Sequence, residues 1–181
     1  MQNIIHLLGL LRFDAPRLPE RAVAAADAYA AWVESHRGYL IDRSAQQLMV
    51  CLPDAGETLA SLHGLMHEGD HHGFTVAGGL VQAIKATEHL PRSPQDFTER
   101  TLETLIEIAG SVSPQQIGIS PKLLSLLQLA VPEYADHFEP GLEAPGRVVT
   151  RVRTMLVMRS ETLPLYDGDF RIADALVAPS R

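Results

Sequence analysis

The sequence predicts an α+β domain with one central sheet flanked by helices, and two observations support this fold class. Apolar runs of strand length alternate with longer segments of helical periodicity between residues 4 and 127. Two of these runs, residues 39–41 and 47–52, are separated by the polar sequence DRSAQ, which is typical of an antiparallel hairpin. A chain of 181 residues is long enough for one such domain and an extension.

The first half of the chain is expected to form a strand, a helix, the hairpin and a second helix. Residues 4–11 are continuously apolar, which suits a strand buried on both faces. Apolar residues then recur at helical spacing over residues 21–35. After the hairpin, a helix with one apolar face should be ended by Gly69 and Gly73.

A strand over residues 74–84 is expected next, because this segment is rich in Val, Ala and Gly. Gly78 and Gly79 allow either a β-bulge or a close backbone approach there. The following helix should begin at Asp96, since Glu99 completes a capping-box pattern. Its predicted buried stripe is Leu102, Leu105, Ile106 and Ala109, and its end is predicted at Gly110.

The last predicted elements of this region are a short strand and a helix. Residues 117–119 are the strand. Ser120 and Pro121 then have the pattern of an N-cap followed by proline at the first helical position. Three leucines, Leu123, Leu124 and Leu127, should face the core.

Composition and charge exclude several classes of protein. The net charge of −7 makes nucleic acid an unsuitable partner. A single cysteine, Cys51, excludes an internal disulfide framework and is expected to be a buried thiol. No apolar run approaches the roughly 20 residues of a membrane span, and the N-terminal run lacks the basic region of a signal peptide. We therefore expect a cytoplasmic protein without a membrane association.

Three segments, in the right order and spacing, resemble the class III nucleotide cyclase domain. The segment SPQQIGIS followed by PKLLSLL resembles the family's PGQI turn, strand and helix. The segment HRGYLIDRSAQQLMVCLP resembles its glycine-led hairpin, and FTVAGGLV resembles the strand that reads close to GIHTG. The resemblance covers residues 2–140 and implies a ferredoxin-like, or palm, antiparallel sheet flanked by helices.

The predicted domain organisation follows from the extent of this resemblance. Residues 1–140 are expected to form the cyclase-homology domain. Residues 141–181 are expected to be a C-terminal extension with a strand over residues 147–158 and a tail, because arginines alternate there with Val, Thr and Met. The resemblance also implies pairing, since cyclase active sites are shared between two subunits.

The resemblance does not extend to the residues that catalysis requires. Cyclases hold two divalent metals with two aspartates, and an alignment on Phe13 places Gly9 and Gln46 at those positions. Neither residue supplies the carboxylate that Mg²⁺ prefers. Glu103 and Glu107 stand where the family has an asparagine and an arginine, and acidic groups repel a triphosphate. The sequence therefore predicts a protein without cyclase activity and without a cofactor.

The leading functional prediction is a non-catalytic signalling or regulatory module that acts as a homodimer or with a protein partner. A weaker alternative is a degenerate GGDEF-like nucleotide-binding effector, because RSAQQLMVCLPDAGETLASL resembles that family's signature hairpin and helix. A third alternative is a metal- or ligand-sensing domain. His63, His67 and His71 recur at intervals of four residues, a spacing at which histidines on a helix can bind Zn²⁺.

Overall fold

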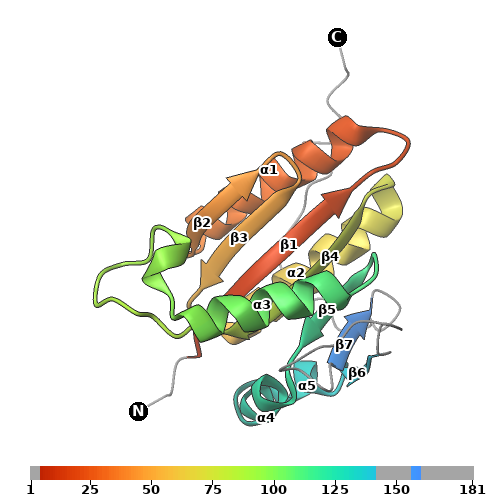
Figure 1. Cartoon of the computed structure of the whole chain (residues 1–181). Coiled ribbons are helices and arrows are strands. Elements are labelled where there is room, and N and C mark those ends of the chain that lie inside the picture. Colours follow the sequence, from red (N-terminus) through yellow and green to blue (C-terminus); the bar gives the residue numbers. More distant parts are fainter. Residues whose placement is uncertain (1–4, 142–155, 160–181) are drawn as a thin grey trace.

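The computed structural model describes residues 5–141 and 156–159, and these form one mixed sheet flanked by helices (Figure 1). The described strands lie in the order β2-β3-β1-β4-β5-β7-β6. Their bounds are β1 Leu7–Asp14, β2 Tyr39–Ser44, β3 Gln47–Leu52, β4 Thr75–Gln82, β5 Gln116–Ile119, β6 Glu139–Pro140 and β7 Leu156–Arg159. The helices are α1 Pro19–Ser35, α2 Ala55–His72, α3 Glu99–Ser111, α4 Pro121–Ala130 and α5 Pro132–Ala135, with a 3₁₀ turn η1 at Pro94–Asp96.

The predicted fold class and the predicted hairpin are confirmed, with one correction to the direction of the strands. Strands β2 and β3 pair in antiparallel fashion around a turn at Ala45 and Gln46. Strand β1 pairs in antiparallel fashion with both β3 and β4. Strands β4 and β5, however, are parallel. The reason is that α3 connects them as a crossover, so the sheet is mixed and not wholly antiparallel.

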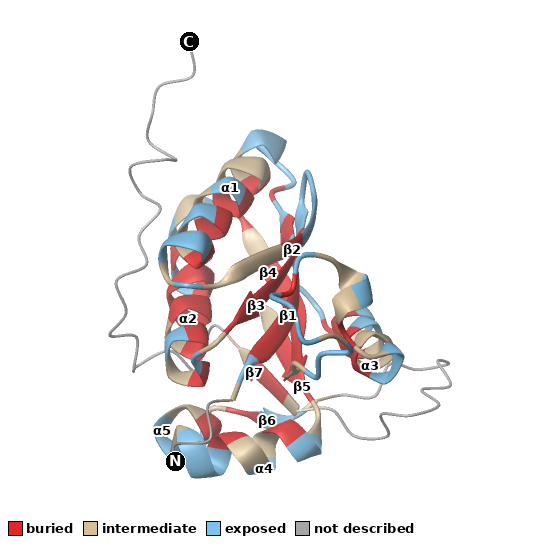
Figure 2. Ribbon diagram, turned by 90° about the vertical axis from the view of Figure 1, so that its left-hand side faces the viewer, coloured by how far each residue is buried: buried red, intermediate tan, exposed pale blue. Residues whose placement is uncertain are grey.

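Helices cover the two faces of the sheet unequally (Figure 2). Helices α1 and α2 lie on one face, where side chains such as Leu11, Tyr29 and Leu62 form the larger core. Helix α3 lies on the other face and packs against a smaller core that includes Leu10 and Ile108. Because β1 contributes alternate residues to the two cores, it is buried on both faces, as predicted.

Gly78 and Gly79 of β4 allow neighbouring backbone to approach closely, and they do not form a β-bulge. The register of β1 and β4 is continuous from Leu7 opposite Gln82 to Asp14 opposite Thr75. A Cβ atom at Gly78 would lie 2.3 Å from the carbonyl oxygen of Leu10. At Gly79, a Cβ atom would lie 2.9 Å from the backbone nitrogen of Ala109 in α3. The first glycine lets the strand approach β1, and the second lets α3 approach the sheet.

The predicted end of α2 at Gly69 is wrong, whereas the end at Gly73 is confirmed. The helix continues to His72, and Gly73 caps it in the left-handed conformation with φ 76°. Gly69 has a packing role instead, because a Cβ atom there would lie 2.6 Å from the carbonyl oxygen of Phe74. A glycine inside a helix therefore marked a close contact and not a helix end.

The predicted start of α3 at Asp96 is also wrong. The N-cap is Thr98, whose hydroxyl oxygen accepts a hydrogen bond from the backbone N–H of Thr101 at 3.3 Å. The carboxylate of Asp96 instead accepts the backbone N–H groups of Arg92 and Ser93, at 2.8 and 2.9 Å. These hydrogen bonds lower the pKa of Asp96. Asp96 thus closes the turn before the helix, and the helix begins two residues later than the capping pattern suggested.

The remaining predictions for α3 and α4 hold in part. Helix α3 ends at Ser111 and not at Gly110. The prediction that Ile106 belongs to the buried stripe is wrong: Ile106 is 57% exposed, and Ile108 is buried instead. At α4 the side chain of Ser120 accepts the backbone N–H of Leu123, as the predicted N-cap should.

The described part of the C-terminal extension belongs to the same sheet. Strand β7 pairs in antiparallel fashion with β5, from Gln116 opposite Arg159 to Ile119 opposite Leu156. The predicted strand over residues 147–158 therefore overlaps β7 in its last three residues, while residues 147–155 and the predicted tail lie outside the described residues. The division of the chain at residue 140 stays a prediction.

Candidate functional site

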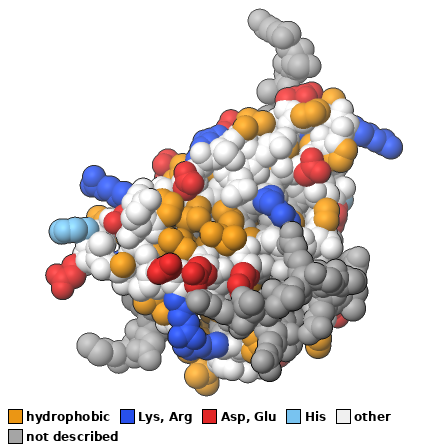
Figure 3. Space-filling model, in the orientation of Figure 1, with side chains coloured by type: hydrophobic (Ala, Val, Ile, Leu, Met, Phe, Trp, Pro, Cys, Tyr) orange, Lys and Arg blue, Asp and Glu red, His pale blue; other side chains and the backbone are white. Residues whose placement is uncertain are grey.

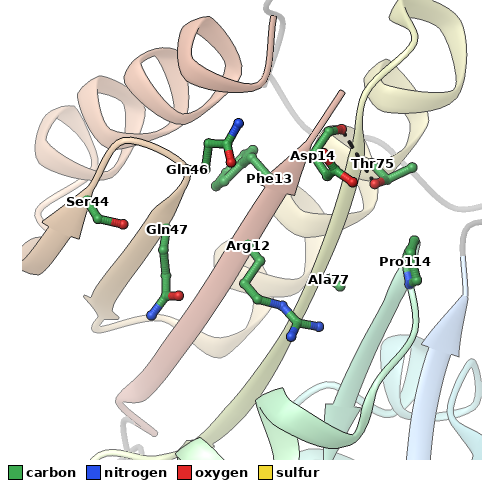
Figure 4. A pocket seen from close by; sticks show the side chains of 9 residues that line it. All are labelled: Arg12, Phe13, Asp14, Ser44, Gln46, Gln47, Thr75, Ala77 and Pro114. Atoms are coloured by element: carbon green, nitrogen blue, oxygen red, sulfur yellow. Dashed lines mark hydrogen bonds between the residues drawn. The ribbon is translucent and has the colours of Figure 1, made fainter. Parts of the chain in front are cut away.

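A polar pocket lies where β1 ends, the β2–β3 hairpin turns and β4 begins (Figure 4). Its volume is about 420 Å³. Nine residues line it: Arg12, Phe13, Asp14, Ser44, Gln46, Gln47, Thr75, Ala77 and Pro114. The pocket is formed by sheet pairing, because it takes its residues from the four neighbouring strands β2, β3, β1 and β4, from the hairpin turn and from the turn before β5.

The end of β1 supplies the two charged side chains of this pocket. Arg12 and Asp14 are separated by one residue, so they point to the same face of the sheet. The guanidinium of Arg12 donates to the carbonyl oxygen of Val112 at 3.2 Å, which ties the strand to the end of α3. The hydroxyl of Thr75 donates to the backbone carbonyl oxygen of Asp14 at 3.5 Å, and the Asp14 carboxylate is exposed.

The hairpin turn contributes an amide and not a second carboxylate. Gln46 lines the pocket at the turn, and its backbone carbonyl oxygen accepts the N–H of Phe13 at 2.7 Å. Asp14 is therefore the single carboxylate among the described residues that line the pocket. A pocket with one carboxylate, one guanidinium and neutral hydroxyl and amide groups suits a polar ligand better than a pair of divalent metals.

Gly9, which the sequence alignment placed at the first metal position, does not lie in this pocket. Within β1 it is paired with Val50 on one side and Leu80 on the other. A Cβ atom there would point at the side chains of Leu80 and Val50, at 3.1 and 3.6 Å, in the core below α1 and α2. Gly9 is also three residues, or about 10 Å, from Arg12, which pairs beside the hairpin turn. Gly9 and Gln46 therefore could not share a metal.

Asp14 is the residue that the sequence alignment missed. An alignment on Phe13 places the first metal position at Gly9, which lies inside β1 and not at its end. The strand register instead places Asp14 at the end of β1, beside the turn that carries Gln46. The signal for Asp14 in the sequence was an acidic residue at the polar end of an apolar strand. The residues that lie beside Asp14, however, follow only from the pairing of β1 with β3.

Two of the acidic residues on α3 are partly buried beside the smaller core. Glu103 and Glu107 are half-buried, whereas Glu99 is exposed. Figure 3 shows acidic side chains next to an area of hydrophobic side chains on the face of the molecule that carries α3. Helix α3 thus places two half-buried carboxylates on the side of the sheet that holds the smaller core.

The three histidines of the predicted metal site do not come together. His63 is fully buried, and its ring lies against the rings of Tyr134 and His137. His67 and His71 are exposed, and their ring centroids lie 4.5 Å apart. In residues 5–141 and 156–159, no group of three His, Cys, Asp or Glu side chains is arranged to hold a metal ion. Helical periodicity placed His63 on the buried side of α2 and the other two on the solvent side.

Comparison with known proteins identifies the fold. No protein-family model and no curated protein matches the sequence. The structure is similar to that of an adenylate cyclase from Trypanosoma brucei in its monomeric state, with a TM-score of 0.50, 10% identity and coverage of 91% of this chain and 92% of that chain. It is also similar to an adenylate/guanylate cyclase/hydrolase from Silicibacter pomeroyi, with a TM-score of 0.48, 12% identity and coverage of 83% and 94%.

Two further predictions are the absence of a membrane span and the GGDEF-like alternative. The described helices are too short or too polar to cross a lipid bilayer. The GGDEF-like alternative stays a prediction. The element order, the sheet and the similarity to the Trypanosoma brucei enzyme agree with the motifs found in the sequence. The chain therefore has the fold of the class III adenylate and guanylate cyclase domains.

Proposed function

We propose that this domain is a non-catalytic cyclase-homology module that acts in signalling or regulation by pairing with a second copy or a protein partner. The observation that carries this proposal is the polar pocket at the end of β1, where Asp14 is accompanied by Gln46 and Arg12. Cyclisation of a nucleoside triphosphate needs two divalent metals, one to activate the attacking hydroxyl and both to neutralise the triphosphate. One carboxylate beside a guanidinium is a poor ligand set for two Mg²⁺ ions.

The charge on α3 supports the same proposal. Glu103 and Glu107 lie on the helix that crosses the sheet face next to the pocket strands. A transition state that gathers negative charge on phosphate oxygens is stabilised by positive groups and destabilised by carboxylates. The chain thus keeps the sheet and the helices of a cyclase domain while its charges differ from those that the reaction requires.

A pairing surface is supported by the uneven cover of the sheet. Helix α3 covers only part of the sheet face that it packs on, and hydrophobic side chains gather beside it (Figures 2 and 3). Tyr39 is half-buried at this face, and Ile106 on α3 is 57% exposed. Apolar groups at such a surface gain free energy when a second protein covers them.

The experiment that tests the proposal combines an activity assay with a measurement of mass. The pure protein is incubated with ATP or GTP and with Mg²⁺ or Mn²⁺, and cyclic products are quantified by mass spectrometry. We expect no cyclic nucleotide above the level of a boiled sample. Light scattering at increasing concentration should show a dimer. Formation of any cyclic nucleotide would overturn the non-catalytic assignment, and a monomer at high concentration would overturn self-pairing.

A further inference from the structure

His63 is a fully buried histidine that has no hydrogen-bond partner among the described residues. It lies in the middle of α2 with an exposed fraction of 0%. Neither ring nitrogen, Nδ1 or Nε2, has a hydrogen-bond partner within residues 5–141 and 156–159. A buried polar atom without a partner costs free energy, and a protonated imidazole in the same place would cost more, because it would carry an unpaired charge. The position therefore favours the neutral ring.

The ring of His63 faces a segment that is distant in sequence. Tyr134 of α5 lies edge-on at a centroid distance of 5.5 Å, and His137 lies at 5.6 Å with an interplanar angle of 79°. The same segment contributes Ala135 and Phe138 to the larger core and continues into β6. Three aromatic rings therefore join the middle of α2 to α5 and to the residues that lead to the sheet edge.

The charged groups around this contact do not compensate for a proton on His63. His137 is the neighbouring titratable group on the facing segment, and a proton on its ring would have the same sign of charge as protonated His63. Three acidic residues of that segment, Glu133, Asp136 and Glu139, are exposed, and Glu139 forms an ion pair with Arg159 at 3.0 Å. On α2 itself, His67 lies one turn further along and is exposed. Protonation of His63 would thus add a buried charge that faces a second histidine ring.

We propose that the contact between His63 and His137 is an acid-sensitive switch, which releases the segment 131–140 from α2 when His63 takes up a proton. Release would detach α5 and β6, which pairs with β7, and so would loosen the edge of the sheet beyond β5. The inference rests on the buried ring and its neighbours, and it does not depend on the proposed function.

The direction and the size of the effect follow from the pKa of His63. Burial, and to a lesser extent the charge of His137, lowers this pKa from 6.5 to about 4. When segment 131–140 is released, the ring of His63 on α2 is exposed to water and its pKa returns to about 6.5. The contact is therefore fully stable above pH 6.5 and weakens as the pH falls towards 4. At pH 5 the linkage relation gives a release equilibrium roughly 20-fold more favourable than at pH 7.

Hydrogen exchange of the full chain tests this proposal. Backbone amide protection is measured by mass spectrometry at pH 7 and pH 5 and is corrected for the intrinsic pH dependence of exchange. We expect segment 131–140 to lose protection by roughly 20-fold at pH 5 relative to pH 7. The variant His63→Leu should keep the same protection at both pH values. The control variant His89→Gln, which removes an exposed histidine from a distant loop, should behave as the unchanged protein does.

Two results would overturn the proposal. One is an equal loss of protection at pH 5 in His63→Leu and in the unchanged protein, which would assign the effect to other groups. The other comes from an NMR titration of the unchanged protein and does not depend on whether the variant folds. An imidazole of His63 that titrates near pH 6.5, as an exposed ring does, would show that the proton is taken up without release.

Discussion

The backbone N–H of Phe13 donates a hydrogen bond to the carbonyl oxygen of Gln46 at a distance of 2.7 Å. This contact fixes the turn of the β2–β3 hairpin against the end of β1, so that Asp14 and Gln46 line one pocket. The side chain at position 46 therefore decides whether the pocket holds one carboxylate or two. Because this hydrogen bond involves the backbone alone, we expect it to survive a change of side chain at position 46.

A second carboxylate at the hairpin turn should create a metal site. We expect Gln46→Asp to raise the affinity for Mn²⁺ by about 10-fold or more, because divalent cations bind paired carboxylates better than a single one. Isothermal titration calorimetry measures the affinity. The double variant Asp14→Asn with Gln46→Asp is the control, and it should lose the gain. If Gln46→Asp binds Mn²⁺ no better than the unchanged protein, the two side chains do not converge.

The sequence predicted the strands and helices better than it predicted the pocket. Runs of apolar residues identified β1 and α2 because burial on one or both faces imposes a periodicity that the sequence retains. The neighbour of Gln46 across the sheet depends on strand register, which no local pattern records. An alignment on Phe13 thus selected Gly9, whereas pairing brings Asp14 to the site. In the same way, regular spacing grouped three histidines although only His67 and His71 share a face.

Gly78 should be the least replaceable glycine of β4. We expect Gly78→Ala to lower the free energy of unfolding by about 2 kcal/mol or more, because the new Cβ would lie 2.3 Å from the carbonyl oxygen of Leu10. Urea unfolding followed by the fluorescence of Trp32 measures the loss. Gly9→Ala is the matched control and should cost less, since its nearest neighbour is the flexible end of the Leu80 side chain at 3.1 Å. Equal losses would contradict the strand geometry.

Thr98, and not Asp96, should determine the stability of the first turn of α3. We expect Thr98→Ala to lower the free energy of unfolding by about 1 kcal/mol, because the N–H of Thr101 loses its acceptor. Asp96→Ala should leave that turn intact and should instead increase proteolysis near Arg92 and Ser93, whose N–H groups it frees. Thermal unfolding and limited proteolysis measure the two effects. Loss of protection at the start of α3 in Asp96→Ala would show that Asp96 caps the helix after all.

Cys51 should react slowly in the folded protein. Burial raises the pKa of its thiol to about 11, and the charge of Lys85 offsets this only in part. Since the thiolate is the reactive form, we expect alkylation at pH 8 to be about 100-fold slower in the folded protein than in urea. The unfolded chain ionises first as the pH rises above 9, so this thiol also weakens the fold between pH 9 and 11. Equal rates of alkylation in the two states would contradict the burial of Cys51.

The exposed side of α3 should contribute to pairing if the proposed function is correct. We expect Ile106→Glu to convert the dimer to a monomer in light scattering, because a third acidic side chain would join Glu103 and Glu107 where an apolar contact is lost. The unfolding midpoint should change little, since Ile106 is 57% exposed. Leu129→Glu, at a position on α4 that is 86% exposed, is the matched control and should leave the dimer intact. Dissociation by both variants to the same extent would place the pairing surface elsewhere than α3.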